Sequence, residues 1–211
     1  DSSQIAMVIH NLRQQTVGKK ENLFYCLSDF VAPVATGKQD WIGAFAVAID
    51  CENSGILKSL HDQKDDYGII MIKALADRLA EAYAEYLHWQ VRRKFWGYSA
   101  NEKSDSADFI SENYQGIRPA PGYPACPDHS QKVDLFNLLD AKNEIGIKLT
   151  ENYAMLPTAA VSGWYFSHPD ARYFSVGKID RDQIVDYAER KGESIEVIEK
   201  LLEPNLAYER G

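Results

Sequence analysis

The residues best suited to chemistry lie in one stretch, residues 118–129, which reads Arg-Pro-Ala-Pro-Gly-Tyr-Pro-Ala-Cys-Pro-Asp-His. It holds four of the chain's eight prolines, which predicts a stiff, shaped loop and excludes helix interior or central strand. Gly122 lets a backbone or a ligand approach closely. Arg118 offers a fork of cationic donors and Tyr123 a flat aromatic face, which together suit a small ligand carrying a carboxylate and a flat ring.

The same stretch resembles the signature of a known family, the reactivation domain of cobalamin-dependent methionine synthase, which binds S-adenosylmethionine (AdoMet). The likeness rests on Arg-x-x-x-Gly-Tyr at residues 118–123, continued as Pro-Ala-Cys-Pro-Asp-His. Further blocks match in the same order at residues 25–33, 74–82 and 161–169. The resemblance therefore covers the chain from about residue 10 to its end.

The resemblance implies a set of residues that contact AdoMet: Arg118, Ala120, Gly122, Tyr123, Tyr173 and Phe174, together with Glu81 and Glu112. Arg118 is expected to grip the ligand's carboxylate bidentately. Tyr123 is expected to face the methyl group and, in the assembled enzyme, the corrin ring. The two glutamates would supply negative charge near the sulfonium and the amine.

Each of these residues also has a plainer interpretation. Arg118 suits a solvated surface salt bridge, and Tyr123 suits a tyrosine that only covers core. Tyr173 and Phe174 are good strand formers, and adjacent strand residues point to opposite faces, so one would face the ligand while the other packs.

Glu81 has a plainer interpretation too. It shares a predicted helix face with Asp77 and Glu85 at i, i+4 spacing, and such a face is usually solvated.

No catalytic residue and no metal site are predicted. Glu85-x-x-His88 has the spacing of a carboxylate-bridged di-iron site, but no second copy exists. Cys126 and His129 offer two zinc-type ligands, and no matching pair elsewhere completes four. No Ser/His/Asp ordering or phosphate-binding loop is evident.

By resemblance, the chain binds AdoMet and presents its methyl group to cob(I)alamin while an oxidised methionine synthase is reactivated. The resemblance implies a methyltransferase only as part of a longer chain. Its cobalamin-binding domain would hold the cofactor, flavodoxin or an equivalent reductase would supply an electron, and zinc would occur only in a homocysteine domain outside this chain. The alternatives are a non-catalytic AdoMet sensor or interaction module, and a structural module that binds nothing.

Composition narrows the class of protein. The 211 residues are 45% hydrophobic, which suits one domain with a real core. A net charge of −8 argues against a nucleic-acid surface, and the absence of a long apolar run argues against a membrane span. Three cysteines without C-x-x-C spacing indicate reduced thiols and a cytoplasmic location.

The elements that must position these residues indicate an α+β domain with an antiparallel sheet and one long central helix. That helix is expected from Asp66 to about Trp96, because Asp65 and Asp66 provide its N-cap and apolar residues then recur at helical spacing. Strands are expected at 23–31, 41–49 and 153–156, with an antiparallel hairpin over 159–179. Shorter helices are expected at 107–114, 132–143, 180–191 and 195–202.

The resemblance implies one AdoMet-binding domain over residues 1–211. Because it begins at Asp1 and not at Met, it is expected to be part of a longer polypeptide. In the family the domain extends further toward its N-terminus, by on the order of a hundred residues. That part carries an aspartate that also holds AdoMet, and Asp29 is not its counterpart.

Overall fold

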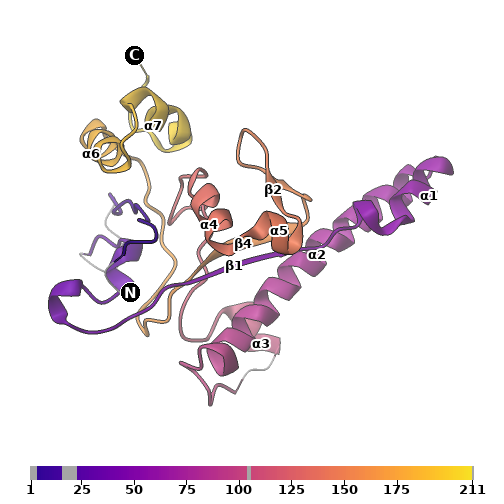
Figure 1. Cartoon of the computed structure of the whole chain (residues 1–211), viewed down its shortest axis with the longest axis horizontal. Coiled ribbons are helices and arrows are strands. Elements are labelled where there is room, and N and C mark those ends of the chain that lie inside the picture. Colours follow the sequence, from indigo (N-terminus) through magenta and orange to yellow (C-terminus); the bar gives the residue numbers. More distant parts are fainter. Residues whose placement is uncertain (1–3, 16–22, 104–105, 211) are drawn as a thin grey trace.

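The computed structural model describes residues 4–15, 23–103 and 106–210. Its centre is an antiparallel pair of strands, β1 (Gly43–Ala48) and β4 (Ala160–Tyr165). Helix α2 (Asp66–Gln90) lies along one face of the pair, and α4 (Gln131–Leu139) and α5 (Ala141–Ile145) pack on the other (Figure 1). This arrangement confirms the predicted α+β class with an antiparallel sheet and a long central helix.

Strand periodicity explains the three layers. In β1 the side chains of Phe45 and Val47 join the core beneath α2, whereas Ala44 and Ala46 face the core that contains α4 and α5. Successive strand residues point to opposite faces, so each strand serves both cores. A second short pair, β2 (Lys148–Leu149) with β3 (Met155–Leu156), lies beyond α5.

Helix α2 begins where the sequence predicts. The Asp65 carboxylate accepts a hydrogen bond from the Gly68 amide at 2.9 Å, which satisfies one of the free N–H groups of the first turn. A row of buried residues at i, i+4 spacing lets the helix approach the sheet closely: Ala76, Ala80, Ala84 and His88. The helix continues as a π-helical turn over Val91–Phe95, so the predicted end near Trp96 is confirmed.

The remaining helices surround this centre. Helix α1 (Ile56–Asp62) packs on the first turns of α2, and the two project together from the body of the molecule (Figure 1). Helix α3 is short, at Ser106–Ser111. Helices α6 (Arg181–Lys191) and α7 (Ile195–Leu201) share a separate core, which Leu12 from the N-terminal segment completes.

Two predicted β elements are wrong. Residues 23–31 contain a 3-10 helix, Leu27–Phe30, because Asp29 accepts a hydrogen bond from the Cys26 amide at 2.9 Å and closes a turn.

The predicted hairpin over 159–179 does not form either. One edge of β4 pairs with β1, and Ile117 and Pro119 take the other edge. Residues 171–178 are therefore irregular, and Tyr173 and Phe174 do not lie on a strand.

Candidate functional site

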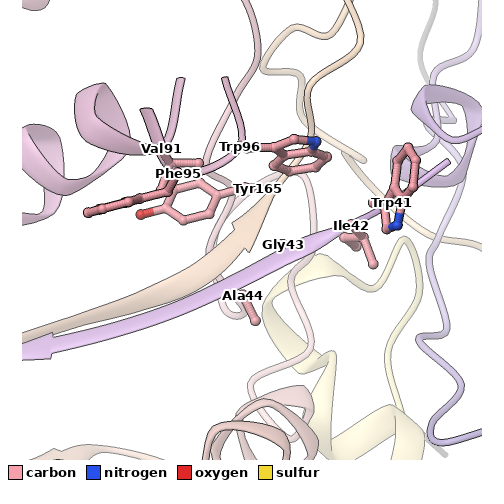
Figure 2. A pocket seen from close by; sticks show the side chains of 8 residues that line it. All are labelled: Trp41, Ile42, Gly43, Ala44, Val91, Phe95, Trp96 and Tyr165. Atoms are coloured by element: carbon pink, nitrogen blue, oxygen red, sulfur yellow. The ribbon is translucent and has the colours of Figure 1, made fainter. Parts of the chain in front are cut away.

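Two of the cavities near the sheet have linings that differ in kind. One, of about 560 Å³, is lined by aromatic and aliphatic residues without any charge, among them Trp41, Phe95 and Trp96 (Figure 2). The other, of about 420 Å³, is lined by one arginine, two glutamates and the proline-rich loop. Only the second offers partners for a charged ligand, and its volume falls in the range of small-molecule sites.

The second cavity brings together residues that are far apart in the sequence. All but one of the predicted AdoMet contacts line it: Glu81, Glu112, Arg118, Ala120, Tyr123, Tyr173 and Phe174. Pro119, Pro124, Ala125 and Val161 complete the wall. The exception, Gly122, shapes the loop behind the cavity.

The start of the loop is fixed against β4. Ile117 and Phe166 exchange backbone hydrogen bonds at 3.0 Å, and the Trp164 amide donates to the Pro119 carbonyl at 2.9 Å. Gly163 makes this contact possible, because a Cβ there would lie 2.5 Å from the Pro119 oxygen. The backbone of residues 117–119 therefore pairs with the edge of β4 that β1 leaves free.

The middle of the loop is a tight turn closed by its own backbone. The Tyr123 amide donates to Ala120 at 3.1 Å, and the Cys126 amide donates to Tyr123 at 2.9 Å. The Cys126 thiol donates to the Ala120 carbonyl at 2.9 Å, and burial, aided by Asp128, raises the pKa of that thiol to about 12. The Cys126 thiol therefore stays protonated, and its hydrogen bond stabilises the turn.

Gly122 and Tyr123 occupy the tip of this turn. Gly122 has a φ of +96°, and any Cβ there would overlap the His129 ring. Its role is steric, since only glycine fits beside that ring. The Tyr123 side chain is left 62% exposed, with one part on the cavity and the rest in solvent.

The far end of the loop is anchored to α6. The buried Asp128 carboxylate accepts from the Lys191 ammonium at 2.5 Å and from the Tyr187 hydroxyl at 2.9 Å. Burial alone would raise the pKa of Asp128, but the Lys191 charge and the hydrogen bonds from Lys191 and Ser130 outweigh it and hold that pKa below its usual value. The loop is consequently fixed at both ends by different elements.

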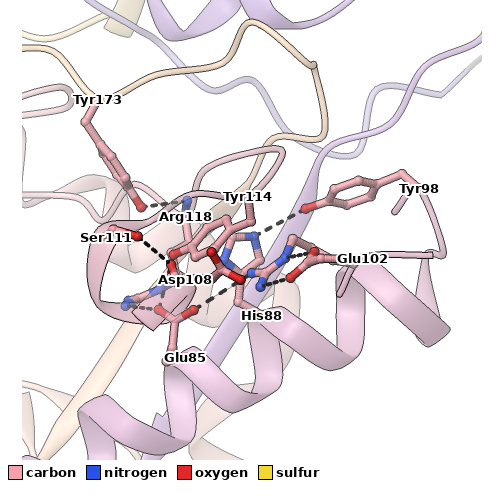
Figure 3. A network of polar contacts seen from close by, with 10 residues as sticks. Glu85, His88, Tyr98, Glu102, Asp108, Ser111, Tyr114, Arg118 and Tyr173 are labelled. Atoms are coloured by element: carbon pink, nitrogen blue, oxygen red, sulfur yellow. Dashed lines mark hydrogen bonds and ion pairs between the residues drawn. The ribbon is translucent and has the colours of Figure 1, made fainter. Parts of the chain in front are cut away.

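Arg118 lies at the centre of a polar network (Figure 3). Its Nη2 donates to the Glu85 carboxylate at 3.0 Å, and its backbone amide donates to the Tyr173 hydroxyl at 3.0 Å. Its Nε is buried without a hydrogen-bond partner. Burial lowers the pKa of Arg118, but the negative charge of Glu85 and its hydrogen bond raise it, and the net result is a raised pKa. Arg118 therefore forms a salt bridge that is mostly buried, unlike the solvated surface pair of the plainer interpretation, and it also lines the cavity with donor capacity to spare.

Glu81 and Glu112 bring the negative charge. Glu81 lies on the exposed side of α2, and Glu112 follows α3 with a φ of +52°. Together with Arg118 they give the cavity one cation and two carboxylates. These charges are complementary to a ligand that carries both an α-amino and a carboxylate group.

Glu85 is the residue of this network whose burial sequence reasoning missed. Its i, i+4 relation to Glu81 suggested a solvated face, but its side chain is only 18% exposed. A signal was present: Glu85 directly follows Ala84 and precedes His88 by three residues, both on the buried side of α2.

Among residues 4–15, 23–103 and 106–210, no three His, Cys, Asp or Glu side chains are placed to hold a metal ion. His129 instead contacts the Lys132 ammonium through Nδ1 at 3.0 Å. In the same part of the chain, no helix combines the length and the apolar character needed to cross a membrane.

The chain is similar to known proteins of one family. The family described as "Vitamin B12 dependent methionine synthase, activation domain" matches residues 1–192. A solved structure, the "Crystal Structure of the MetH Reactivation Domain bound to AdoHcy", is similar over 98% of this chain, with 54% sequence identity and a TM-score of 0.92. The present chain spans 63% of that longer chain.

Proposed function

Because the chain belongs to the family of vitamin B12-dependent methionine synthase activation domains, we propose that its charged cavity binds AdoMet. The observation that carries this proposal is the convergence of Arg118, Glu81 and Glu112 on one cavity beside the proline-rich loop. The similar MetH domain was solved with AdoHcy, which is AdoMet without its transferable methyl group, and this supports the same ligand class here.

Each part of the cavity suits one part of the ligand. Arg118 would hold the carboxylate, because its Nε is unpaired and its charge is shared only in part with Glu85. Glu81 and Glu112 would favour the amine and the sulfonium cation. Ala120 lines the cavity from the proline-rich loop, and Tyr173 and Phe174 line it from the irregular segment at residues 171–178.

The methyl group would be presented outward. Tyr123 reaches from the cavity into solvent, so a methyl group held beside it is accessible to a second domain. We infer that this second domain is the cobalamin-binding domain of the same polypeptide, with flavodoxin or an equivalent reductase as electron donor. Cobalamin supplies the methyl-accepting chemistry when bound there, and this chain contributes binding and orientation.

Calorimetric titration of AdoMet and AdoHcy into the 211-residue chain tests the proposal. Wild-type chain should bind both. Arg118→Ala should weaken binding by about 1.5–3 kcal/mol, the range for hydrogen bonds to charged groups, or roughly ten- to a hundredfold. Arg210→Ala is the matched control, since Arg210 forms a surface salt bridge with Glu203 outside the cavity. No binding by folded wild-type chain would overturn the proposed function, and unchanged binding by folded Arg118→Ala would remove Arg118 from the site.

A further inference from the structure

Glu85 accepts hydrogen bonds from two residues of the segment that follows α3, of which Arg118 lines the cavity and Tyr114 lies outside its lining. Its Oε2 accepts from Arg118 Nη2 at 3.0 Å and from the Tyr114 hydroxyl at 3.2 Å (Figure 3). Its Oε1 lies 3.9 Å from Nη1 of the fully buried Arg92. Arg118 and Glu85 are both less than one-fifth exposed, so solvent screens their interaction only weakly.

Arg92 does not need Glu85 as its partner. Its Nε and Nη2 donate to the Glu102 carboxylate at 2.7 and 2.8 Å, and its guanidinium carbon lies 3.7 Å above the Tyr114 ring. For Arg118, by contrast, Glu85 is the carboxylate within ion-pair distance among the described residues. The orientation of Arg118 therefore depends on Glu85, while that of Arg92 does not.

Tyr114 extends the influence of Glu85 to a second site residue. The Tyr114 hydroxyl is tied to Glu85, and the Tyr114 amide donates to the Glu112 carbonyl at 2.9 Å. Glu112 itself has a left-handed backbone, which a non-glycine residue adopts only where its surroundings hold it. One carboxylate on α2 thus holds both the arginine and the segment that carries a glutamate of the cavity.

We propose that Glu85 is a positioning residue for recognition of the ligand's amino-acid portion: it fixes the Arg118 guanidinium directly and the Glu112 segment through Tyr114. It does not line the cavity, so it acts through those two residues. With one Nη engaged by Glu85, the unpaired Nε and the remaining donors of Arg118 are held ready for a carboxylate. This inference rests on the proposed function.

The test compares two ligands that differ only in the amino-acid portion. AdoHcy carries the α-amino carboxylate, and 5′-methylthioadenosine carries the same nucleoside and thioether without it. Calorimetry on wild-type chain, Glu85→Gln and Glu85→Ala gives the affinity ratio of the two ligands. Glu85→Ala should lower AdoHcy affinity by roughly tenfold or more and leave methylthioadenosine affinity unchanged. Glu85→Gln retains an acceptor and should lose only about threefold.

Glu102→Gln is the matched control, because it weakens a buried pair of the same network that does not involve Arg118. It should lower the melting temperature and leave the ligand ratio unchanged. If Glu85→Ala does not fold, Glu85→Gln together with Tyr114→Phe decides the question through the same ratio.

Three results are distinguishable. Wild-type chain that binds neither ligand would contradict the proposed function itself. If the ratio of AdoHcy to methylthioadenosine affinity is the same as in wild-type chain in folded Glu85→Ala, or in both Glu85→Gln and Tyr114→Phe, the proposed role of Glu85 is overturned. Tighter AdoHcy binding in any of them would also overturn it, because Glu85 would then compete with the ligand for Arg118.

Discussion

Gly163 and Pro119 are in direct backbone contact: a Cβ on Gly163 would lie 2.5 Å from the Pro119 carbonyl oxygen. The next amide of β4, that of Trp164, donates to the same oxygen at 2.9 Å. The strand and the proline-rich loop therefore share an edge that has no space for a side chain. The position of the cavity wall depends on the absence of one methyl group.

Gly163→Ala is predicted to destabilise the chain and to weaken ligand binding. The new methyl group must push the loop away from β4, and overpacking of this kind costs about 1–3 kcal/mol. Chemical denaturation and AdoHcy titration measure the two effects. Gly146→Ala is the control, since Gly146 has a φ of +73° and open space around it. That variant should lose about 1 kcal/mol through backbone strain and keep its ligand affinity. A Gly163→Ala chain with unchanged affinity would mean that the loop adapts.

His88 is predicted to make the stability of the chain pH-dependent. It is fully buried, and burial, aided by the Arg92 and Arg118 charges, lowers its pKa from 6.5 to about 2. Below pH 6.5 the unfolded chain takes up a proton that the folded chain refuses, so stability falls as the pH falls. Between pH 7 and pH 5 this one group should cost roughly 2 kcal/mol.

The measurement is urea denaturation of wild-type chain and His88→Phe at both pH values. Phenylalanine keeps a ring to stack on Tyr165, which lies 5.0 Å from the His88 ring, but it cannot titrate. The variant should lose about 2 kcal/mol less on acidification, whatever its stability at pH 7. His10 and His129 have lowered pKa values too, and they titrate equally in both proteins. Equal losses would show that His88 is protonated in the folded state.

The chain alone is predicted not to consume AdoMet. Its cysteines are the most nucleophilic side chains, but Cys126 is buried with a pKa near 12 and hydrogen-bonded to Ala120. Incubation of the chain with AdoMet, followed by chromatography, should give no AdoHcy above the background without protein. Adding a cobalamin-binding domain and a reductant should give methylcobalamin. Protein-dependent AdoHcy from the lone chain would indicate a different enzyme.

The sequence predicted the elements whose signals are local. The Asp65 and Asp66 cap and the helical spacing of the apolar residues predicted α2, because caps and helical periodicity act within a few residues. The helices expected at 180–191 and 195–202 also form, as α6 and α7. Strand partners depend on distant residues, so the propensities of residues 172–179 could not reveal that the loop at 117–119 takes the free edge of β4.

The resemblance predicted most of the residues that line the candidate site, but not the residue behind them. The motif residues do converge on one cavity, and the resemblance supplied them. Helical spacing indicates that Glu85 lies near the buried side of α2, but its proposed role depends on partners at residues 114 and 118, which that spacing does not encode. Whether each lining residue contacts AdoMet stays a prediction.

An exposed apolar row on α2 leads to the last prediction, that the chain self-associates. Five side chains lie on the side of α2 away from its buried alanines, each about half exposed: Met71, Leu75, Leu79, Tyr83 and Tyr86. The first turns of α2 project from the body of the molecule, so another surface can reach them (Figure 1). An exposed apolar row of this kind favours association, because covering it removes apolar area from water.

Light scattering over a range of protein concentrations measures this association. We expect the apparent mass to rise with concentration in wild-type chain. Leu79→Glu should suppress the rise, because it places a charge in the centre of the row. Ala74→Glu adds the same charge at an exposed position of the same helix outside the row, and it should associate like wild-type. If both variants still associate, the row is not the interface, and the apolar cavity around Trp41 and Phe95 is the next surface to mutate. If the wild-type chain is monomeric at every concentration, the prediction is wrong.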